Sequence, residues 1–225
     1  MARHTLTREQ IVQAAIELLD AEGIDGLSMR QLGRKLGTAA TAVYWHMNSR
    51  DDLLGLAADD VWGEIELPEL GEVGWREKVI TLANGIYAMI IRHPWLIPAM
   101  STQLTYGPGK ARCDDHFLAT FEAAGFTQPL ADNAYRTVLT FTLGNALGDA
   151  AEAAWRTRLR RNGENEEEHL SQAMARVSDI ARQFPRLRAR LEPFQDDDGD
   201  ASPDHDLATG LATILNGLEA QLTKR

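Results

Sequence analysis

The sequence predicts an all-α protein in two parts: a small three-helix unit over residues 1–50 and a larger helical part over residues 51–225. Three observations predict this fold class. Proline and glycine fall at the boundaries of segments with helical apolar spacing, and helix-capping residues precede several of those segments. No stretch longer than a few residues alternates apolar and polar side chains, so we expect no sheet.

Helix-capping signals are clearest in the first fifty residues. Thr7 and Gln10 form a capping box, and Ser28 and Gln31 form a second. Ser49 begins a third capped segment, which is rich in leucine. The helices expected in this part of the chain cover residues 8–21, 29–36, 40–46 and about 50–65.

Beyond Pro68 the expected helices are longer. They cover residues 75–92, 94–103, 110–124, 129–160, 168–191 with a kink at Pro185, and 204–222. A glycine-proline-glycine breaker at 107–109 and an acidic loop at 196–203 separate some of them. This part therefore reads as one large helical domain.

Two of the later helices carry apolar stripes. The stripes are Leu139, Leu143, Ala146, Leu147 and Ala150 in the first helix, and Leu207, Leu211, Ile214, Leu215 and Leu218 in the second. Two such stripes per chain predict a four-helix bundle across a two-fold axis, and so a homodimer. The alternative is that both stripes are buried within one chain.

Composition excludes a membrane protein and a disulfide-stabilised one. The longest apolar run is Ile86–Ile91, whereas a membrane-spanning helix needs about 20 such residues. The N-terminal residues lack the apolar segment of a secretory signal. Cys113 is the only cysteine, so no intrachain disulfide can form, and we expect a reducing, cytoplasmic location.

Charge is distributed unevenly along the chain. The formal net charge is −10, yet residues 26–50 contain Arg30, Arg34, Lys35, Arg50 and no acidic residue. An acidic protein with one basic patch is expected to turn that patch toward a polyanion. Four basic residues in such a stretch are also ordinary for a solvated surface, so charge alone gives weak support.

Residues 28–46, SMRQLGRKLGTAATAVYWH, carry the functional prediction. They predict two short helices joined by a tight turn at Gly37, the second small enough to enter a DNA major groove about 12 Å wide. The expected core contacts are Leu32, Leu36 and Val43. The expected outward residues are Ala40, Thr41, Tyr44, Trp45 and His46. Arg30 can reach a guanine edge or a phosphate, and Arg50 lies where a helix N-terminus can bind phosphate.

This segment resembles the helix-turn-helix of the TetR family, and most closely its tetracycline-repressor branch. The resemblance covers residues 7–62 and rests on Leu27-Ser28, Arg30, Leu32, Leu36-Gly37, Val43-Tyr44-Trp45-His46 and Leu53-Leu54. It implies a transcriptional repressor that binds a palindromic operator in double-stranded DNA as a homodimer and is released by a small molecule. It also implies a larger C-terminal helical domain for ligand binding and dimerisation.

The resemblance implies DNA contacts for Arg30, Thr41, Tyr44, Trp45, His46 and Arg50. Where the tetracycline-repressor branch has Gln-Pro-Thr at the start of the third helix, this chain has Ala40-Thr41-Ala42. Two polar base-reading residues are therefore missing, so the operator sequence does not carry over. Ala40 and the Thr41 methyl group instead favour apolar contact with a thymine methyl. Tyr44 and Trp45 could instead be core aromatics, and His46 could merely cap its helix.

A ligand pocket is expected in the larger part, among scattered aromatic and methionine side chains. A pocket needs a few polar groups among apolar ones. The candidate ligand-binding residues are Asn84, Tyr87, Met100, Gln103, Phe121 and Asn145, for a small hydrophobic or amphipathic ligand. The alternative is a filled core with no pocket.

No catalytic or metal-binding motif accompanies these signals. Cys113 and His116 are three residues apart on an expected helix, but a metal site would need a further ligand. We therefore expect neither a cofactor, nor a metal, nor an enzyme. The alternatives are a helical enzyme or small-molecule carrier with an incidental three-helix unit, and a regulator that activates or needs no ligand.

Overall fold

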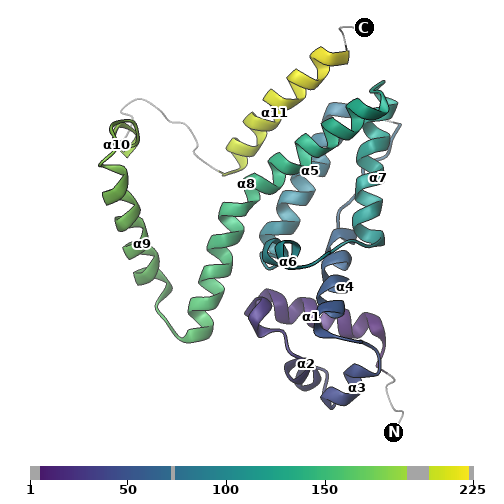
Figure 1. The fold of residues 1–225 in the computed structure, drawn as a ribbon, viewed down its shortest axis with the longest axis vertical. Coiled ribbons are helices and arrows are strands. Elements are labelled where there is room, and N and C mark those ends of the chain that lie inside the picture. Colours follow the sequence, from purple (N-terminus) through teal and green to yellow (C-terminus); the bar gives the residue numbers. More distant parts are fainter. Residues whose placement is uncertain (1–5, 72–73, 192–202, 223–225) are drawn as a thin grey trace.

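The computed structural model describes residues 6–71, 74–191 and 203–222, and it contains no strand in these ranges. The all-α prediction is confirmed. The helices, shown in Figure 1, are α1 Arg8–Glu22, η1 Ile24–Gly26, α2 Met29–Lys35, α3 Ala40–Tyr44, α4 Arg50–Gly63, α5 Trp75–Arg92, α6 Leu96–Thr102, α7 Pro108–Ala123, α8 Gln128–Asn162, α9 Glu166–Ala181, α10 Pro185–Leu191 and α11 Pro203–Leu222.

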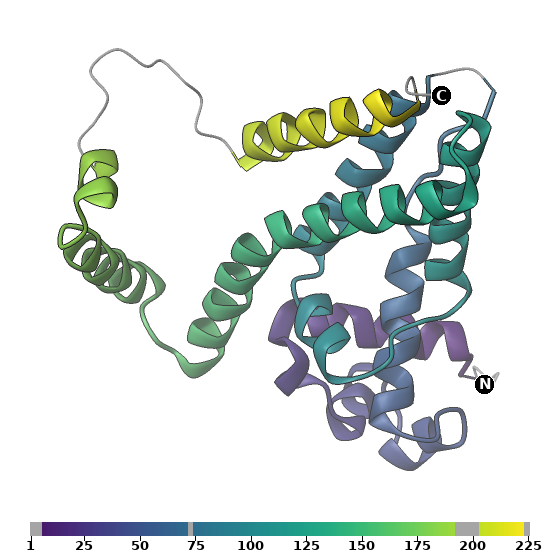
Figure 2. The same cartoon turned by 45° about the horizontal axis from the view of Figure 1, so that its top comes forward.

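Three parts of the molecule can be distinguished. We call α1 to α3 the head, α5 to α8 with α11 the body, and α9 with α10 the arm. Helix α4 begins in the head, packs on α1, and continues along α7 of the body. In Figures 1 and 2 the arm extends from the far end of α8 and stands apart from the body. The domain boundary expected at residue 50 thus falls at the first residue of a helix that contacts both head and body.

The expected caps form as written in the sequence. The Thr7 side chain accepts the Gln10 N–H while the Gln10 side chain accepts the Thr7 N–H. Ser28 and Ser49 cap α2 and α4, since their hydroxyl oxygens accept the backbone N–H groups of Gln31 and Asp52. The second expected capping box is only half formed, because the Gln31 side chain accepts the Ser28 hydroxyl instead of the Ser28 N–H. Each cap satisfies a backbone donor that the first helical turn leaves free, so these helix starts are fixed locally.

Two expected boundaries were wrong. Pro108 and Gly109 begin α7 rather than break the chain before it, because proline at a first helical position gives up no hydrogen bond. The Asp59 carboxylate of α4 accepts the N–H groups of Gly109 and Lys110, at 3.0 and 2.9 Å, and so supplies the missing cap. The helix expected to kink at Pro185 is two helices, since α9 ends at Ala181 and α10 begins at Pro185. The acidic loop expected over 196–203 lies almost wholly outside the described residues.

The stripe predicted for dimerisation on α11 is largely buried within its own chain. Leu207, Leu211, Leu215 and Leu218 are all buried, and α11 packs on α8 and α5. A side chain at Gly210 would collide with the Phe141 ring of α8, since its Cβ would lie 2.2 Å from the ring edge. The alternative of burial within one chain therefore describes most of this stripe, whereas Leu147 of α8 stays exposed.

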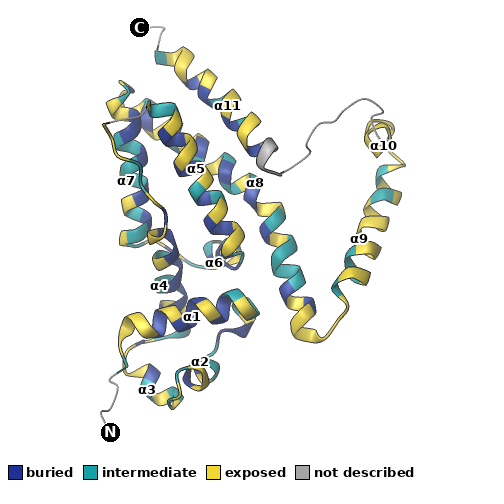
Figure 3. Ribbon diagram, turned by 180° about the vertical axis from the view of Figure 1, so that it is seen from behind, coloured by how far each residue is buried: buried dark blue, intermediate teal, exposed yellow. Residues whose placement is uncertain are grey.

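One continuous apolar core runs from the head into the body. It includes Ile11 and Leu32 in the head, Trp62 at the end of α4, and Phe117 in the body. Figure 3 shows that burial concentrates along α4, α5, α7 and the first half of α8, while the arm is mostly exposed. Among the described residues, no helix combines the length and apolarity needed to cross a membrane.

Candidate DNA interface and ligand cavity

Helices α2 and α3 approach each other closely at a tight turn. Gly37 has a φ of 64°, in the left-handed region that favours glycine. A Cβ at Gly33 would lie 2.9 Å from the Thr38 carbonyl oxygen and 3.0 Å from the Ala40 backbone nitrogen. The two glycines therefore allow a short α3 to cross α2 at close range, which is the geometry of a helix-turn-helix.

The two faces of α3 differ sharply in exposure. Val43 is fully buried against the head, together with Leu32 of α2. On the opposite side Tyr44 is 55% exposed and Trp45 is 86% exposed. Thr41 and His46 are also exposed, and Ala40 is half-buried. A core role for Tyr44 and Trp45 is excluded by this exposure, and the outward face expected for α3 is confirmed.

The four basic residues of the stretch 26–50 are not equivalent. Arg30 and Arg34 are exposed, and neither guanidinium group makes a hydrogen bond or ion pair within the described part of the chain. Lys35 pairs with Glu17 of α1 at 2.7 Å, which neutralises part of the patch. The free cationic surface of the patch is therefore carried by Arg30 and Arg34.

Arg50 lies at the first position of α4 but turns toward the head. Its Nε and one terminal nitrogen donate to the carbonyl oxygens of Leu27 and Ile24, at 2.8 and 2.6 Å. These bonds tie α4 to the loop between α1 and α2. The phosphate contact expected for Arg50 stays a prediction, because most of its guanidinium is already committed to the backbone.

The six candidate ligand-binding residues are not gathered around one cavity. Asn84 is exposed on α5, and Tyr87 donates to Asp149 of α8. Gln103 donates to the carbonyl of Asp51, and Asn145 to that of Phe141. Phe121 packs in an aromatic cluster, with ring centroids 5.9 Å from Trp75 and 5.2 Å from Phe126, while Met100 is half-buried on α6.

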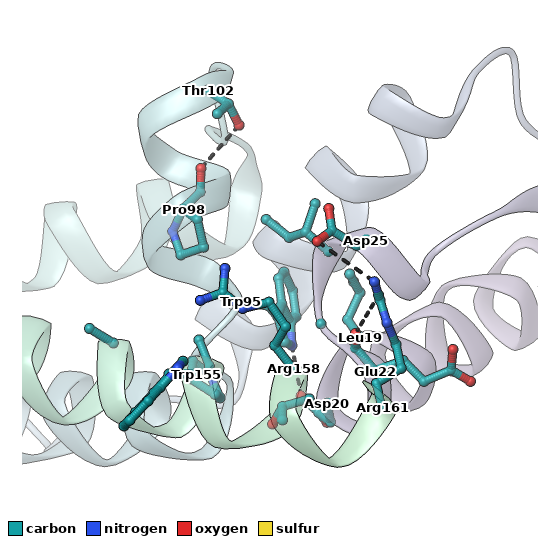
Figure 4. A pocket seen from close by; sticks show the side chains of 16 residues that line it. Leu19, Asp20, Glu22, Asp25, Trp95, Pro98, Thr102, Trp155, Arg158 and Arg161 are labelled. Atoms are coloured by element: carbon teal, nitrogen blue, oxygen red, sulfur yellow. Dashed lines mark hydrogen bonds and ion pairs between the residues drawn. The ribbon is translucent and has the colours of Figure 1, made fainter. Parts of the chain in front are cut away.

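A cavity of about 380 Å³ lies elsewhere, between the head and the body. The end of α1 and the following turn form one wall, α6 with the residues before it forms a second, and the last turns of α8 form the third. Figure 4 shows Leu19 and Asp25 on the head side, Pro98 and Thr102 on α6, and Trp155 and Arg158 on α8. The described residues that line it include none of the six candidates.

Next to this cavity, a network of polar side chains connects head and body. The Trp95 indole N–H donates to the Asp20 carboxylate of α1 at 2.7 Å, and the His93 Nδ1 lies 2.7 Å from the same carboxylate oxygen. The His93 Nε2 lies 3.3 Å from the Glu64 carboxylate. His93 is the C-cap of α5, as its position before Pro94 predicts, but its buried ring also bridges two carboxylates.

The charge state of His93 follows from these neighbours. Burial lowers the pKa of the imidazole, but the hydrogen bond and negative charge of Asp20, with a further contribution from Glu64, outweigh it. The pKa of His93 is therefore raised above its ordinary value of 6.5. Protonated His93 would pair with both carboxylates at once.

Metal-type residues do not cluster in the described part of the chain, where no group of three or more potential ligands occurs. Cys113 is buried, and burial raises the pKa of its thiol to about 11. At neutral pH the sulfur is therefore a neutral thiol and a poor metal ligand or nucleophile.

Comparison with known families and relatives assigns both parts of the chain. Residues 67–222 match the family model of the tetracyclin repressor-like C-terminal domain, and residues 11–57 match that of bacterial regulatory proteins of the tetR family. An HTH-type transcriptional regulator of Saccharopolyspora erythraea is 36% identical over 151 residues, which is 67% of this chain and 63% of that regulator, slightly under two thirds of its length. The repressor DrrR1 of Streptomyces coeruleorubidus is 29% identical over 98% of this chain and 80% of its own.

Solved structures resemble the whole chain. Apo ActR of Streptomyces coelicolor is 27% identical, with a TM-score of 0.74 over 99% of each chain. The structure of ActR in complex with actinorhodin is 28% identical, with a TM-score of 0.73 over 97% of this chain and 98% of that one.

Proposed function

The chain belongs to the TetR family of bacterial regulatory proteins, and we propose that it is a transcriptional repressor that binds a palindromic operator as a homodimer and is released by a small molecule. The single observation that carries the DNA-binding role is the outward face of α3, where Tyr44 and Trp45 are exposed, on a helix that packs against α2 with its exposed Arg30. Exposed aromatic side chains near a cation are typical of a surface that binds a partner and are uncommon on a surface that stays in contact with water. Because the proposed target is operator DNA, we propose a cytoplasmic location.

Base contacts and phosphate contacts are expected to come from different residues. Ala40, Thr41, Tyr44, Trp45 and His46 lie on or just after α3, which is small enough to enter a major groove. Arg30 at the start of α2 is free to reach a guanine or a phosphate. Arg50 contributes by fixing the start of α4 against the head and adds a phosphate contact only with its remaining N–H groups.

Salt dependence of duplex binding tests the DNA-binding role. Each neutralised phosphate contributes a slope of roughly −0.9 to log K against log salt. Arg30→Ala is expected to reduce that slope and to change the preferred sequence selected from a random duplex pool, whereas Arg136→Ala, an exposed arginine on α8, changes neither. An affinity that stays flat between low and moderate salt contradicts the proposal and favours the helical carrier or enzyme.

Dimerisation is supported by faces that a single chain leaves uncovered. Leu147 of α8 is 51% exposed, and Gly144 and Gly148 beside it leave room for a second helix. The arm carries an apolar stripe whose members are between 43% and 58% exposed: Met174, Val177, Ile180, Phe184, Leu187 and Leu191. Such stripes are normally buried, so a second copy is the expected cover for both.

Sedimentation tests the dimer. The parent protein is expected to sediment as a dimer at micromolar concentration, and Leu147→Glu is expected to shift it toward the monomer without loss of helix content. Ile80→Glu, a partly exposed apolar position on α5, serves as the matched control. A parent protein that sediments at the mass of one chain, 24.9 kDa, contradicts this part of the proposal.

Release by a ligand requires that the two heads change their spacing. A dimer must hold its recognition helices about 34–36 Å apart to enter successive major grooves. Helix α4 runs from the head at Ser49 to the body, where Asp59 caps α7, so movement of the body is passed to the head. Linkage then requires that operator weaken ligand binding by the factor by which ligand weakens operator binding. A ligand that binds equally well with and without operator contradicts the release mechanism.

A further inference from the structure

We propose that the cavity between head and body is an effector site for a flat, largely apolar molecule that carries one acidic group, and that filling it lowers operator affinity. This inference rests on the proposed function and deepens it, because it gives the regulatory ligand a place and a chemical class. It also differs from the expectation of a pocket among the six candidate residues inside the body.

The size and lining of the cavity suit a small organic ligand. Its volume of about 380 Å³ falls within the range of about 300–1,000 Å³ of ligand pockets. Pro94, Pro98 and Ala154 provide apolar walls, and the half-buried Trp155 provides a flat one. These prolines and the indole form an apolar part of the lining that suits a planar apolar body, while charged and threonine side chains form much of the rest.

The lining holds the carboxylates of Asp20, Glu22 and Asp25 and the guanidinium groups of Arg158 and Arg161, and the group without a partner selects the polar group of the ligand. The Asp20 carboxylate already accepts the Trp95 indole N–H, and Glu22 accepts the Gln31 amide. By contrast, the exposed Arg158 of α8 has no hydrogen bond or ion pair within the described residues, and Figure 4 shows its side chain among those that line the pocket. A guanidinium without a partner one turn from Trp155 binds a carboxylate, sulfonate or phenolate.

Weak contacts across the same cavity make the site suitable for regulation. Arg161 at the end of α8 reaches the Glu22 carbonyl at 3.4 Å and the Asp25 carboxylate at 4.0 Å. Both distances are long, so a ligand that separates α8 from α1 displaces these contacts at little cost. The hydrogen bonds of Asp20 with Trp95 and His93 are short, so we expect them to persist and to act as the pivot about which the head rotates relative to the body. The ligand can lower operator affinity only as far as it binds the rotated head position more tightly than the operator-binding position.

Fluorescence of anilinonaphthalene sulfonate, a flat aromatic probe with one acidic group, tests the binding site in the full chain. The parent protein is expected to bind one probe per chain. Ala154→Phe fills the cavity and is expected to weaken probe binding at least tenfold, and Arg158→Ala is expected to weaken it several-fold. Ala123→Phe on α7 and Arg136→Ala on α8 change exposed residues outside the cavity and should bind the probe as the parent does. Thermal melts confirm that all four variants fold.

Operator binding measured with and without saturating probe tests the regulatory step. The probe is expected to lower the operator affinity of the parent about fivefold or more, and to have a smaller effect on Arg158→Ala at the same concentration. Equal probe binding by the parent, Ala154→Phe and Arg158→Ala overturns the site. An unchanged operator affinity at saturating probe overturns the regulation. If the proposed function itself is wrong, the result differs: the parent protein selects no preferred duplex from a random pool, with or without the probe.

Discussion

Head and body bury their apolar side chains over very different distances along the chain. The head packs α1, α2 and α3 within about forty residues, and side-chain caps at Thr7 and Ser28 start α1 and α2. The body packs α5 against α8, which lie far apart in sequence, joins α4 through α7, and closes with α11 on α8. The head therefore keeps its shape through local contacts, whereas the body depends on contacts that form only when the whole chain has folded.

The tryptophans show what this difference means for function. Trp62 at the body end of α4 is fully buried, and Trp95 is almost so. Trp45 in the head is 86% exposed and has no packing role in the single chain. Trp62 and Trp95 therefore contribute to the stability of the fold, whereas Trp45 is available for binding.

The largest expected effect on stability comes from Trp62→Ala, and the comparison with Trp45→Ala tests the difference between the two regions. Trp62→Ala removes a fully buried indole and is expected to cost about 3–5 kcal/mol of unfolding free energy. Trp45→Ala is expected to change stability by less than about 0.5 kcal/mol, because its side chain lies in water, yet to weaken duplex binding. Urea unfolding and duplex titration measure the two quantities. Equal loss of stability in both variants would remove the distinction between the regions.

Glycine substitutions test how α4 is held to the body. A Cβ at Gly109 would lie 2.2 Å from the Asp59 carbonyl oxygen, so Gly109→Ala must separate α4 from α7 and is expected to cost about 2–3 kcal/mol. Gly55→Ala on the same α4 meets nothing within 4 Å and is expected to stabilise the helix by about 0.5–1 kcal/mol. Thermal melts of both variants check the signs. A Gly109→Ala protein as stable as the parent would mean that α4 and α7 separate freely.

Arg50 tests how α4 is held to the head. Arg50→Ala removes the side-chain donor to the carbonyl groups of Leu27 and Ile24, of which the latter keeps the Leu27 N–H, and is expected to cost about 1.5 kcal/mol. Arg34→Ala removes an exposed arginine of the same head and should change stability by less than about 0.5 kcal/mol. Urea unfolding at fixed salt separates the two variants. If both lower duplex affinity and neither changes stability, Arg50 acts through phosphate contact alone.

The smallest effect expected is a pH dependence at the contact between head and body. The pKa of His93 is raised in the folded protein, so its protonated form stabilises the fold below the ordinary pKa of 6.5. That contribution is lost as the pH rises through the higher folded pKa. The stability of the parent should therefore fall over this pH window relative to His93→Gln, measured by urea unfolding at matched ionic strength. Parallel profiles for the two proteins would show that His93 does not titrate in contact with Asp20 and Glu64.

The sequence predicts the head well because its signals are local. A cap such as Ser28 and a turn such as Gly37 act on their immediate neighbours, so the helix boundaries and the outward face of α3 follow from short segments. The cavity could not be predicted, because Leu19, Pro98 and Ala154 meet only through the packing of three distant helices. The stripe on α11 was ambiguous for a related reason, since apolar spacing shows that a face is buried but not against what.

The uneven charge of the molecule has a consequence for the kinetics of the search for DNA. Residues 26–50 carry +4 within a chain of net charge −10, and Figure 1 shows them at the end of the molecule opposite the C-terminus. In such a molecule a DNA surface repels the acidic remainder of the chain and attracts the basic stretch of residues 26–50 while the two are still apart. Encounters in which the acidic surface faces the DNA are thereby shortened, and encounters in which α2 and α3 face the DNA are favoured. The acidic body thus raises the fraction of encounters that can become binding, although it touches no part of the DNA.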